Sequence, residues 1–278
     1  MSFIEILKAI LQGIVQGITE WLPVSSTGHI LLLDALWPMK VSEEFFDVFK
    51  VVIQLGSILA VVALYFRKLN PFSRKKTDGE RRDTWILWAK VLAASLPAAV
   101  IGLLIDDLVD EKLNTPLVIA VTLFLYGVGF ILLESFPPKT KVNSLKELSF
   151  RRALGIGAFQ TLALIPGTSR SGSTILGASL LGTSREVAAE FSFFMAIPVM
   201  LGASGLKAVK FLMKGLSFTR EEWIALAVAT LVAFLVSLAA IRFLMSYIKK
   251  HDFKVFGWYR IALAAAVAVA LACGVFAK

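Results

Sequence analysis

The sequence predicts an all-α integral membrane protein made of two inverted-topology repeats, each with one re-entrant helix hairpin and three transmembrane helices. Composition is the first reason: 57% of the 278 residues are hydrophobic and only 18% are charged, against about 25% charged in a typical soluble domain. The second reason is six apolar stretches long enough to cross a bilayer, which takes about 20 residues. The third is a pair of similar, broken apolar segments, one in each half of the chain.

The composition also excludes several classes of protein. So much apolar surface is incompatible with a disordered chain or a nucleic-acid-binding domain, so no nucleic-acid partner is expected. The single cysteine, Cys273, cannot form an internal disulfide, which excludes a disulfide scaffold. The net charge of +9 is typical of basic cytoplasmic loops in a membrane protein.

In chain order, the first element is the broken segment 4–36, interrupted between Pro23 and His29. Transmembrane helices are expected at about 46–66, 85–105 and 116–136. The second broken segment, 153–182, is interrupted between Pro166 and Thr174, and helices follow at about 190–211, 223–247 and 256–277. Non-helical backbone at membrane depth is tolerated only where protein buries it or it lines a polar cavity. We therefore expect both broken segments to be re-entrant hairpins.

Four collinear matches at nearly one offset indicate an internal duplication. They pair Pro23 with Pro166, Glu44-Phe45 with Glu190-Phe191, Gln54–Ser57 with Met200–Ala203, and Asp83–Ile86 with Glu221–Ile224. We expect a single membrane domain, 1–278, with repeats of about 1–137 and 150–278 joined by a basic cytoplasmic loop. Three crossings per repeat invert the second repeat, and such repeats bring their broken helices together near the bilayer midplane.

Orientation follows from the basic residues, which concentrate in cytoplasmic loops. Segments 67–82 and 137–152 are rich in Lys and Arg, whereas 106–114 is acidic. The sequence therefore predicts a multi-pass plasma-membrane protein with both termini outside.

Ionisable groups within a membrane are candidates for function, and the strongest candidates in the first hairpin are Glu20 and His29. Gln16 and Glu20 are four residues apart and share a helix face. They precede the polar run Ser25, Ser26, Thr27, Gly28 and His29. The alternatives are an interfacial helix-end carboxylate for Glu20 and a satisfied buried imidazole for His29.

The second hairpin places Arg170 among glycines and hydroxyls, namely Gly167, Ser169, Ser171, Gly172, Ser173 and Thr174. Backbone N–H groups freed by glycine form anion nests, and the guanidinium fork suits phosphate oxygens. A helix beginning near Ser173 would direct its positive N-terminus at the same anion. The alternative is a surface turn with a snorkelling arginine.

Together the hairpins supply an anion cradle, a carboxylate, an imidazole and hydroxyls, which is the inventory for phosphoryl chemistry. Glu20, with Gln16 as a second candidate, offers hard oxygen ligands of the kind that Mg²⁺ or Ca²⁺ prefers. The chain has no G-x-x-x-x-G-K-[ST] motif and only two histidines, so neither a P-loop nor a paired-histidine zinc site is expected.

The stretches Q-G-I-T-E-W-L-P-V-S-S-T-G-H and P-G-T-S-R-S-G-S-T resemble the two signature motifs of bacterial undecaprenyl-pyrophosphate phosphatases of the BacA/UppP type. The resemblance covers essentially the whole chain. It implies removal of the terminal phosphate from the C55 isoprenyl pyrophosphate, which recycles the lipid carrier for peptidoglycan, and it implies dependence on Mg²⁺ or Ca²⁺ and a link to bacitracin resistance.

The resemblance also assigns residues. The family's (E/Q)-x-x-x-E motif corresponds to Gln16 and Glu20, its active-site serine, threonine and histidine to Ser26, Thr27 and His29, and its phosphate-binding arginine to Arg170. The Gln variant leaves one acidic metal ligand in that motif.

We therefore expect Glu20, Ser26, His29 and Arg170 to be catalytic, with Ser26 as nucleophile and His29 as general base and acid; attack by a water activated by His29 or Glu20 stays open. The expected phosphate-binding residues are Ser25, Thr27, Gly167, Thr168, Ser169, Ser171, Gly172 and Ser173. Expected partners are a polyprenyl pyrophosphate substrate, reached from the external side, and membrane lipids, and a homodimer is left open. The rival function is a membrane transporter or lipid-phosphate flippase that uses the same midplane anion site.

Overall fold

A computed structural model describes residues 3–213, 215 and 217–276, and their regular secondary structure is helical apart from one isolated bridge between Val142 and Thr183. The helices are α1 (Phe3–Thr19), α2 (Ser26–Leu36), α3 (Glu43–Val52), α4 (Gln54–Leu64), α5 (Phe66–Leu69), α6 (Asp78–Leu108), α7 (Pro116–Ser135), α8 (Phe150–Thr161), α9 (Arg170–Leu180), α10 (Arg185–Met213), α11 (Arg220–Tyr247) and α12 (Lys254–Ala272). A π-helical turn, Val109–Leu113, follows α6, and a 3₁₀ turn, Leu162–Leu164, follows α8.

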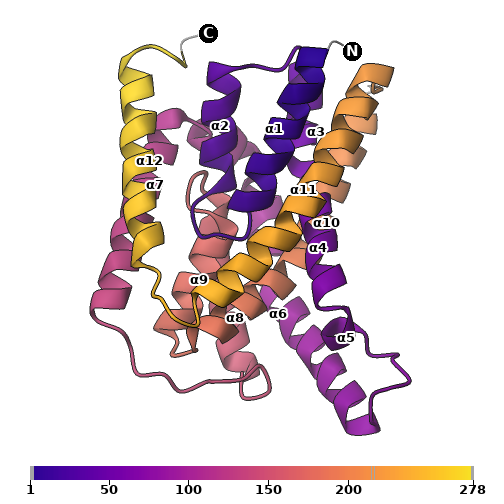
Figure 1. Cartoon of the computed structure of the whole chain (residues 1–278), viewed down its shortest axis with the longest axis vertical. Helices are drawn as coiled ribbons and strands as arrows, with labels where there is room; N and C mark the ends of the chain where they lie inside the picture. The colour runs from indigo at the N-terminus through magenta and orange to yellow at the C-terminus, as the bar shows by residue number, and fades with distance from the viewer. Residues whose placement is uncertain (1–2, 214, 216, 277–278) are drawn as a thin grey trace.

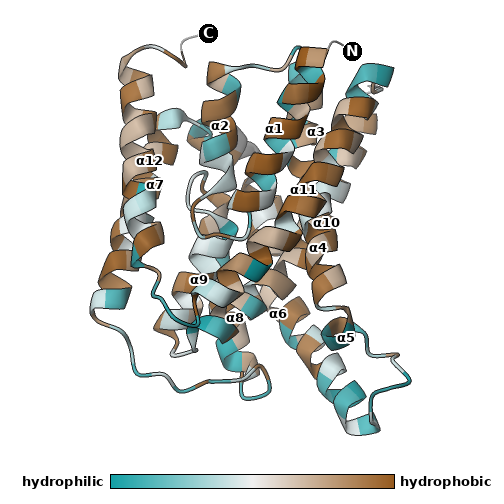
Figure 2. Cartoon of the chain, viewed as in Figure 1, coloured by the Kyte–Doolittle hydropathy of each residue, from teal (hydrophilic) through white to brown (hydrophobic). Residues whose placement is uncertain are grey.

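Six helices within the described residues are long and apolar enough to cross a membrane, and each overlaps one of the six predicted spans. They are Glu43–Leu64, Asp78–Ile105, Pro116–Ser135, Arg185–Met213, Arg220–Tyr247 and Lys254–Ala272. Hydrophobic residues dominate these helices, and hydrophilic residues gather in the loops at the end of the molecule that carries α5 (Figure 2). The chain is therefore an all-α, multi-pass membrane protein.

Local sequence signals set where these helices begin. Thr115 caps α7 by accepting a hydrogen bond from the Val118 amide, and a proline follows at the first helical position, where its missing N–H is not needed. At α11, Thr219 and Glu222 form a capping box. The first span differs from its prediction, since it begins at Glu43 and is interrupted at Ile53 between α3 and α4.

The two broken segments form helix–loop–helix hairpins that approach the middle of the molecule from opposite ends (Figure 1). The first consists of α1 and α2, and the second of α8 and α9. Helix α1 packs closely on α11 and α8 on α6. Glycine permits both approaches, because a Cβ at Gly17 would lie 2.8 Å from the Val236 Cβ and one at Gly157 would lie 2.2 Å from the Ala94 carbonyl oxygen.

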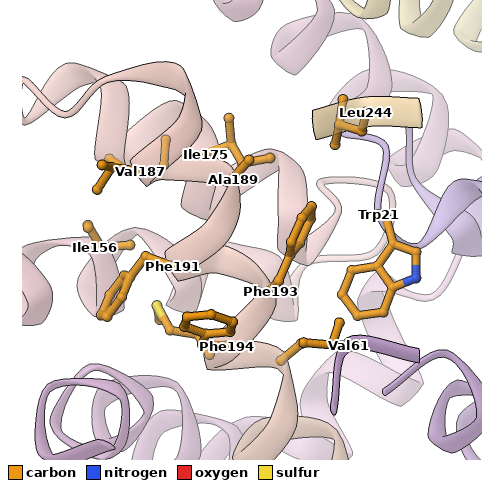
Figure 3. Packing of buried hydrophobic residues seen from close by; sticks show 14 of the residues in the cluster. Trp21, Val61, Ile156, Ile175, Val187, Ala189, Phe191, Phe193, Phe194 and Leu244 are labelled. Atoms are coloured by element: carbon orange, nitrogen blue, oxygen red, sulfur yellow. The ribbon is translucent and has the colours of Figure 1, made fainter. Parts of the chain in front are cut away.

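The hydrophobic core adjoins the tip of the first hairpin. Trp21, at the tip of the first hairpin, is fully buried and packs edge-to-face on Phe193 of α10 at 5.2 Å between ring centroids. Phe191, Phe194, Ile156 and Val61 continue this cluster (Figure 3). Packing against α10 therefore fixes the position of the first hairpin's tip.

Candidate active site

Helices α2 and α9 begin with the same backbone geometry. Their N-cap residues, Ser25 and Ser169, have φ values of 73° and 71°, a left-handed conformation that is uncommon for serine. Each serine Oγ accepts a hydrogen bond from the amide three residues later, Gly28 N at 3.4 Å and Gly172 N at 3.2 Å. Because of this cap, α9 begins at Arg170 and not near Ser173, which corrects the sequence prediction by one helical turn.

A buried ion pair joins the two hairpins. Arg170 Nη2 lies 3.0 Å from Glu20 Oε1, and their side chains are 10% and 5% exposed. Arg170 Nη1 donates to the Ser192 carbonyl oxygen at 2.7 Å and to Ser192 Oγ at 3.1 Å. Arg170 Nε is buried and has no partner. The guanidinium is thus held between Glu20 of the first hairpin and Ser192 of α10, with its Nε unpaired.

The other oxygen of Glu20 serves the first hairpin. Glu20 Oε2 accepts from Gln16 Nε2 at 3.0 Å and from Ser26 Oγ at 3.2 Å, so Gln16 and Glu20 do share one face, as their spacing predicts. The Gln16 Oε1 atom is buried and has no partner. One carboxylate and one unpaired amide oxygen fit a hard cation chemically, although no cluster of three His, Cys, Asp or Glu side chains occurs in the part of the chain that the structure describes.

His29 is turned away from Ser26. Its Nδ1 lies 2.7 Å from the Ser25 carbonyl oxygen and its Nε2 lies 2.7 Å from the hydroxyl of Tyr259 in α12. A carbonyl only accepts, so Nδ1 carries a proton; when the ring is neutral, Nε2 therefore accepts from the Tyr259 hydroxyl. The structure thus brings Ser26 to Glu20 and leaves the predicted contact between Ser26 and His29 unmade.

Several of the residues predicted to bind phosphate already form hydrogen bonds within the protein. Some hydroxyls already hold the loops: Ser171 donates to the carbonyl oxygens of Glu20 and Leu22, and Thr168 donates to carbonyls in its own loop. Ser173 donates to the hydroxyl of Tyr126 at 3.0 Å. Thr27 is exposed, and Gly167 has φ +88°. These groups lie around the first turns of α2 and α9, where N–H groups favour an anion.

Four residues outside the predicted motifs also touch this arrangement. Ser192 holds Arg170, Tyr126 accepts from Ser173, Tyr259 contacts His29, and Arg260 donates to carbonyls of both loop tips. Only Arg260 carries a sequence signal, because it is an ionisable residue inside a predicted transmembrane helix.

The sequence of this chain matches known proteins along most of its length. Residues 9–266 match the family model described as "Bacitracin resistance protein BacA". A protein of Enterococcus faecalis (strain ATCC 700802 / V583) named "Undecaprenyl-diphosphatase" is 57% identical over 267 residues, which cover 95% of this chain and 97% of that protein. "Undecaprenyl-diphosphatase 1" of Clostridioides difficile (strain 630) is 55% identical over 262 residues, or 94% of each chain. An "Undecaprenyl-diphosphatase" of Acetivibrio thermocellus is 56% identical over 263 residues, which cover 94% of this chain and 95% of that protein. The chain therefore belongs to the BacA family.

Proposed function

We propose that this protein hydrolyses undecaprenyl pyrophosphate to undecaprenyl phosphate and inorganic phosphate within the membrane. The observation that carries the proposal is one carboxylate, Glu20, bonded at once to Arg170 of the other hairpin and to the hydroxyl of Ser26. A cation for the phosphate, a nucleophile and a proton acceptor are thereby collected at the meeting of two helix N-termini. The names of the relatives supply the substrate.

In this proposal the terminal phosphate binds at Arg170. The guanidinium is anchored by Ser192 and Glu20, and its unpaired Nε offers one further donor. Helix α9 begins at the same residue, so its N-terminal dipole favours the same anion. Phosphoryl transfer depends on positioning and charge stabilisation more than on covalent chemistry by the protein, and the fixed guanidinium provides both.

The geometry supports Ser26 as nucleophile with Glu20 as its base. Ser26 Oγ donates to Glu20 Oε2, so its proton passes to the carboxylate as the oxygen attacks the terminal phosphorus. The bond from that phosphorus to the bridging oxygen breaks, and undecaprenyl phosphate leaves. Water then attacks the phosphoserine and releases inorganic phosphate. Direct attack by water on the substrate, activated by Glu20 or His29, is the alternative scheme.

We extend the proposal to the metal. Glu20 and the unpaired Oε1 of Gln16 would hold Mg²⁺ or Ca²⁺, with substrate oxygens and water completing the set. When bound, the ion would neutralise charge on the diphosphate.

We also propose that the two halves are inverted repeats and that the site opens to the external side. The matching N-caps at Ser25 and Ser169, and the entry of the two hairpins from opposite ends (Figure 1), support the repeat. The basic segments 67–82 and 137–152 support a cytoplasmic location for the opposite end of the molecule.

The function is tested by measuring phosphate release from undecaprenyl pyrophosphate by the purified protein, with and without a chelator. We expect metal-dependent release that Arg170→Ala abolishes. A well-folded wild-type protein that releases no phosphate in several detergents, with either metal present, would overturn the proposal. The transporter alternative predicts movement of labelled substrate across vesicles without phosphate release, and it leaves the Ser26–Glu20 contact without a purpose.

The nucleophile is tested separately with Ser26→Ala. We expect loss of turnover with unchanged folding. The matched control is Ser95→Ala in α6, which removes a buried hydroxyl bonded only within its own helix. Near-normal turnover by Ser26→Ala would leave water as the attacking group.

A further inference from the structure

Arg260, the seventh residue of α12, is fully buried although α12 is one of the apolar membrane-spanning helices. A charged side chain at such a depth is costly and is retained for a reason. Among the described residues, no carboxylate forms an ion pair with Arg260, and its hydrogen-bond partners are carbonyl oxygens. This charge therefore differs from Arg170, which is paired with Glu20.

The carbonyls that hold Arg260 come from both hairpin loops. Nη1 donates to the Pro23 oxygen at 3.1 Å, and Nη2 donates to the oxygens of Gly167 and Thr168 at 2.8 and 3.0 Å. The first oxygen lies two residues before the N-cap of α2, and the others lie within two residues of the N-cap of α9. One planar guanidinium thus fixes the separation of the two loop tips.

Contacts on the remaining sides fix the guanidinium itself. Its central carbon lies 5.3 Å from the ring centroid of Tyr126, the residue that accepts from Ser173. Arg260 Nε reaches the Leu123 carbonyl oxygen at 3.5 Å. A Cβ added to Gly172 would lie 3.1 Å from Arg260 Nη1, so the positive charge lies against the first turn of α9.

We propose that Arg260 is a positioning residue for the phosphatase reaction, which clamps the two loop tips so that Ser26 and Glu20 on one hairpin meet Arg170 on the other. The inference rests on the function proposed above. It also gives the buried charge a second effect, because a cation beside the N-terminus of α9 strengthens the field that attracts the diphosphate.

The two effects are separable by substitution. Lysine keeps the charge, but its single ammonium group lacks the fork that spans three carbonyls from two loops. Methionine removes both charge and donors while retaining a long apolar chain. A misplacement of reacting groups by about 1 Å costs on the order of 100-fold in rate. We therefore expect Arg260→Lys to lower kcat by about 100-fold with KM little changed, and Arg260→Met to lower kcat similarly and also to raise KM.

The experiment measures kcat and KM for phosphate release from undecaprenyl pyrophosphate by the wild type, Arg260→Lys and Arg260→Met, beside thermal unfolding of each protein. Arg242→Met, at an exposed arginine of α11, is the matched control and should keep wild-type kinetics. Wild-type kcat in Arg260→Lys, or a loss confined to thermal stability with normal kcat in the folded fraction, would overturn the proposal. Because the wild type must release phosphate in the same assay, failure of the proposed function is recognised separately.

Hydrogen exchange supplies a second readout that does not depend on turnover. Loss of the clamp should speed amide exchange in both loops, 20–28 and 164–172, which belong to different hairpins. Faster exchange in α12 and α7 alone, with both loops unchanged, would mean that Arg260 only supports helix packing. Should Arg260→Met fail to fold, Arg260→Lys still provides both measurements.

Discussion

Ser192→Ala is the sharpest test of how Arg170 is held. The Ser192 hydroxyl contacts Arg170 Nη1 at 3.1 Å and the Thr174 hydroxyl at 2.6 Å, whereas the Ser192 carbonyl oxygen keeps its own 2.7 Å bond to Nη1 in the variant. The substitution therefore removes one of two anchors at this nitrogen. A hydrogen bond to a charged group contributes about 1.5–3 kcal/mol, and the surviving carbonyl bond favours the lower end of that range. Since about 1.4 kcal/mol corresponds to a tenfold change in rate, we expect kcat/KM to fall about tenfold.

The assay is phosphate release from undecaprenyl pyrophosphate, with thermal unfolding followed in parallel. The control is Ser204→Ala on the same helix, which removes a buried hydroxyl that donates to the Val51 carbonyl oxygen. Ser204→Ala should lose about 1 kcal/mol of stability for one hydrogen bond, and Ser192→Ala should lose more because its hydroxyl contacts both Arg170 and Thr174. Only Ser192→Ala should lose activity. Equal kcat/KM in the two variants would refute the idea that Ser192 orients Arg170.

Three further predictions follow from the same contacts. Arg170→Lys should lower kcat/KM at least about 100-fold, because one ammonium group cannot contact both Ser192 and Glu20 as the guanidinium does. A fall in kcat/KM of tenfold or less in the phosphate-release assay would contradict this. Gly167→Ala should destabilise the protein by about 1–2 kcal/mol or more, since φ +88° is strained for a residue with a Cβ, and Gly205→Ala, where nothing lies within 4 Å, should not; equal thermal unfolding would contradict it. Tyr259→Phe removes the hydroxyl at His29 Nε2 and should lower kcat several-fold with unchanged folding; an unchanged pH–rate profile and kcat would mean that His29 needs no such partner.

Much of the architecture could be predicted because it depends on local signals. Length and apolarity predict the six membrane-spanning helices, and each appears within the described residues. The spacing of Gln16 and Glu20 predicts their side-chain contact, since four residues make one helical turn. The sequence places the start of α9 one turn too late. The deciding feature is the positive φ of Ser169, and a serine-rich sequence does not show which serine adopts that conformation.

The partners of the site could not be predicted, because they arise from contacts distant in sequence. The sequence alone determined that Glu20, Ser26, His29 and Arg170 lie in broken membrane segments, since polar groups and Gly-Pro breaks within apolar stretches are costly anywhere else. Only the tertiary structure decided that Ser26 faces Glu20 while His29 faces Tyr259. The tertiary structure likewise places Arg260 within hydrogen-bonding distance of carbonyl oxygens in both loop tips. The direction of a side chain at a loop tip depends on packing against other helices. The sequence of one helix does not show which helices will be its neighbours.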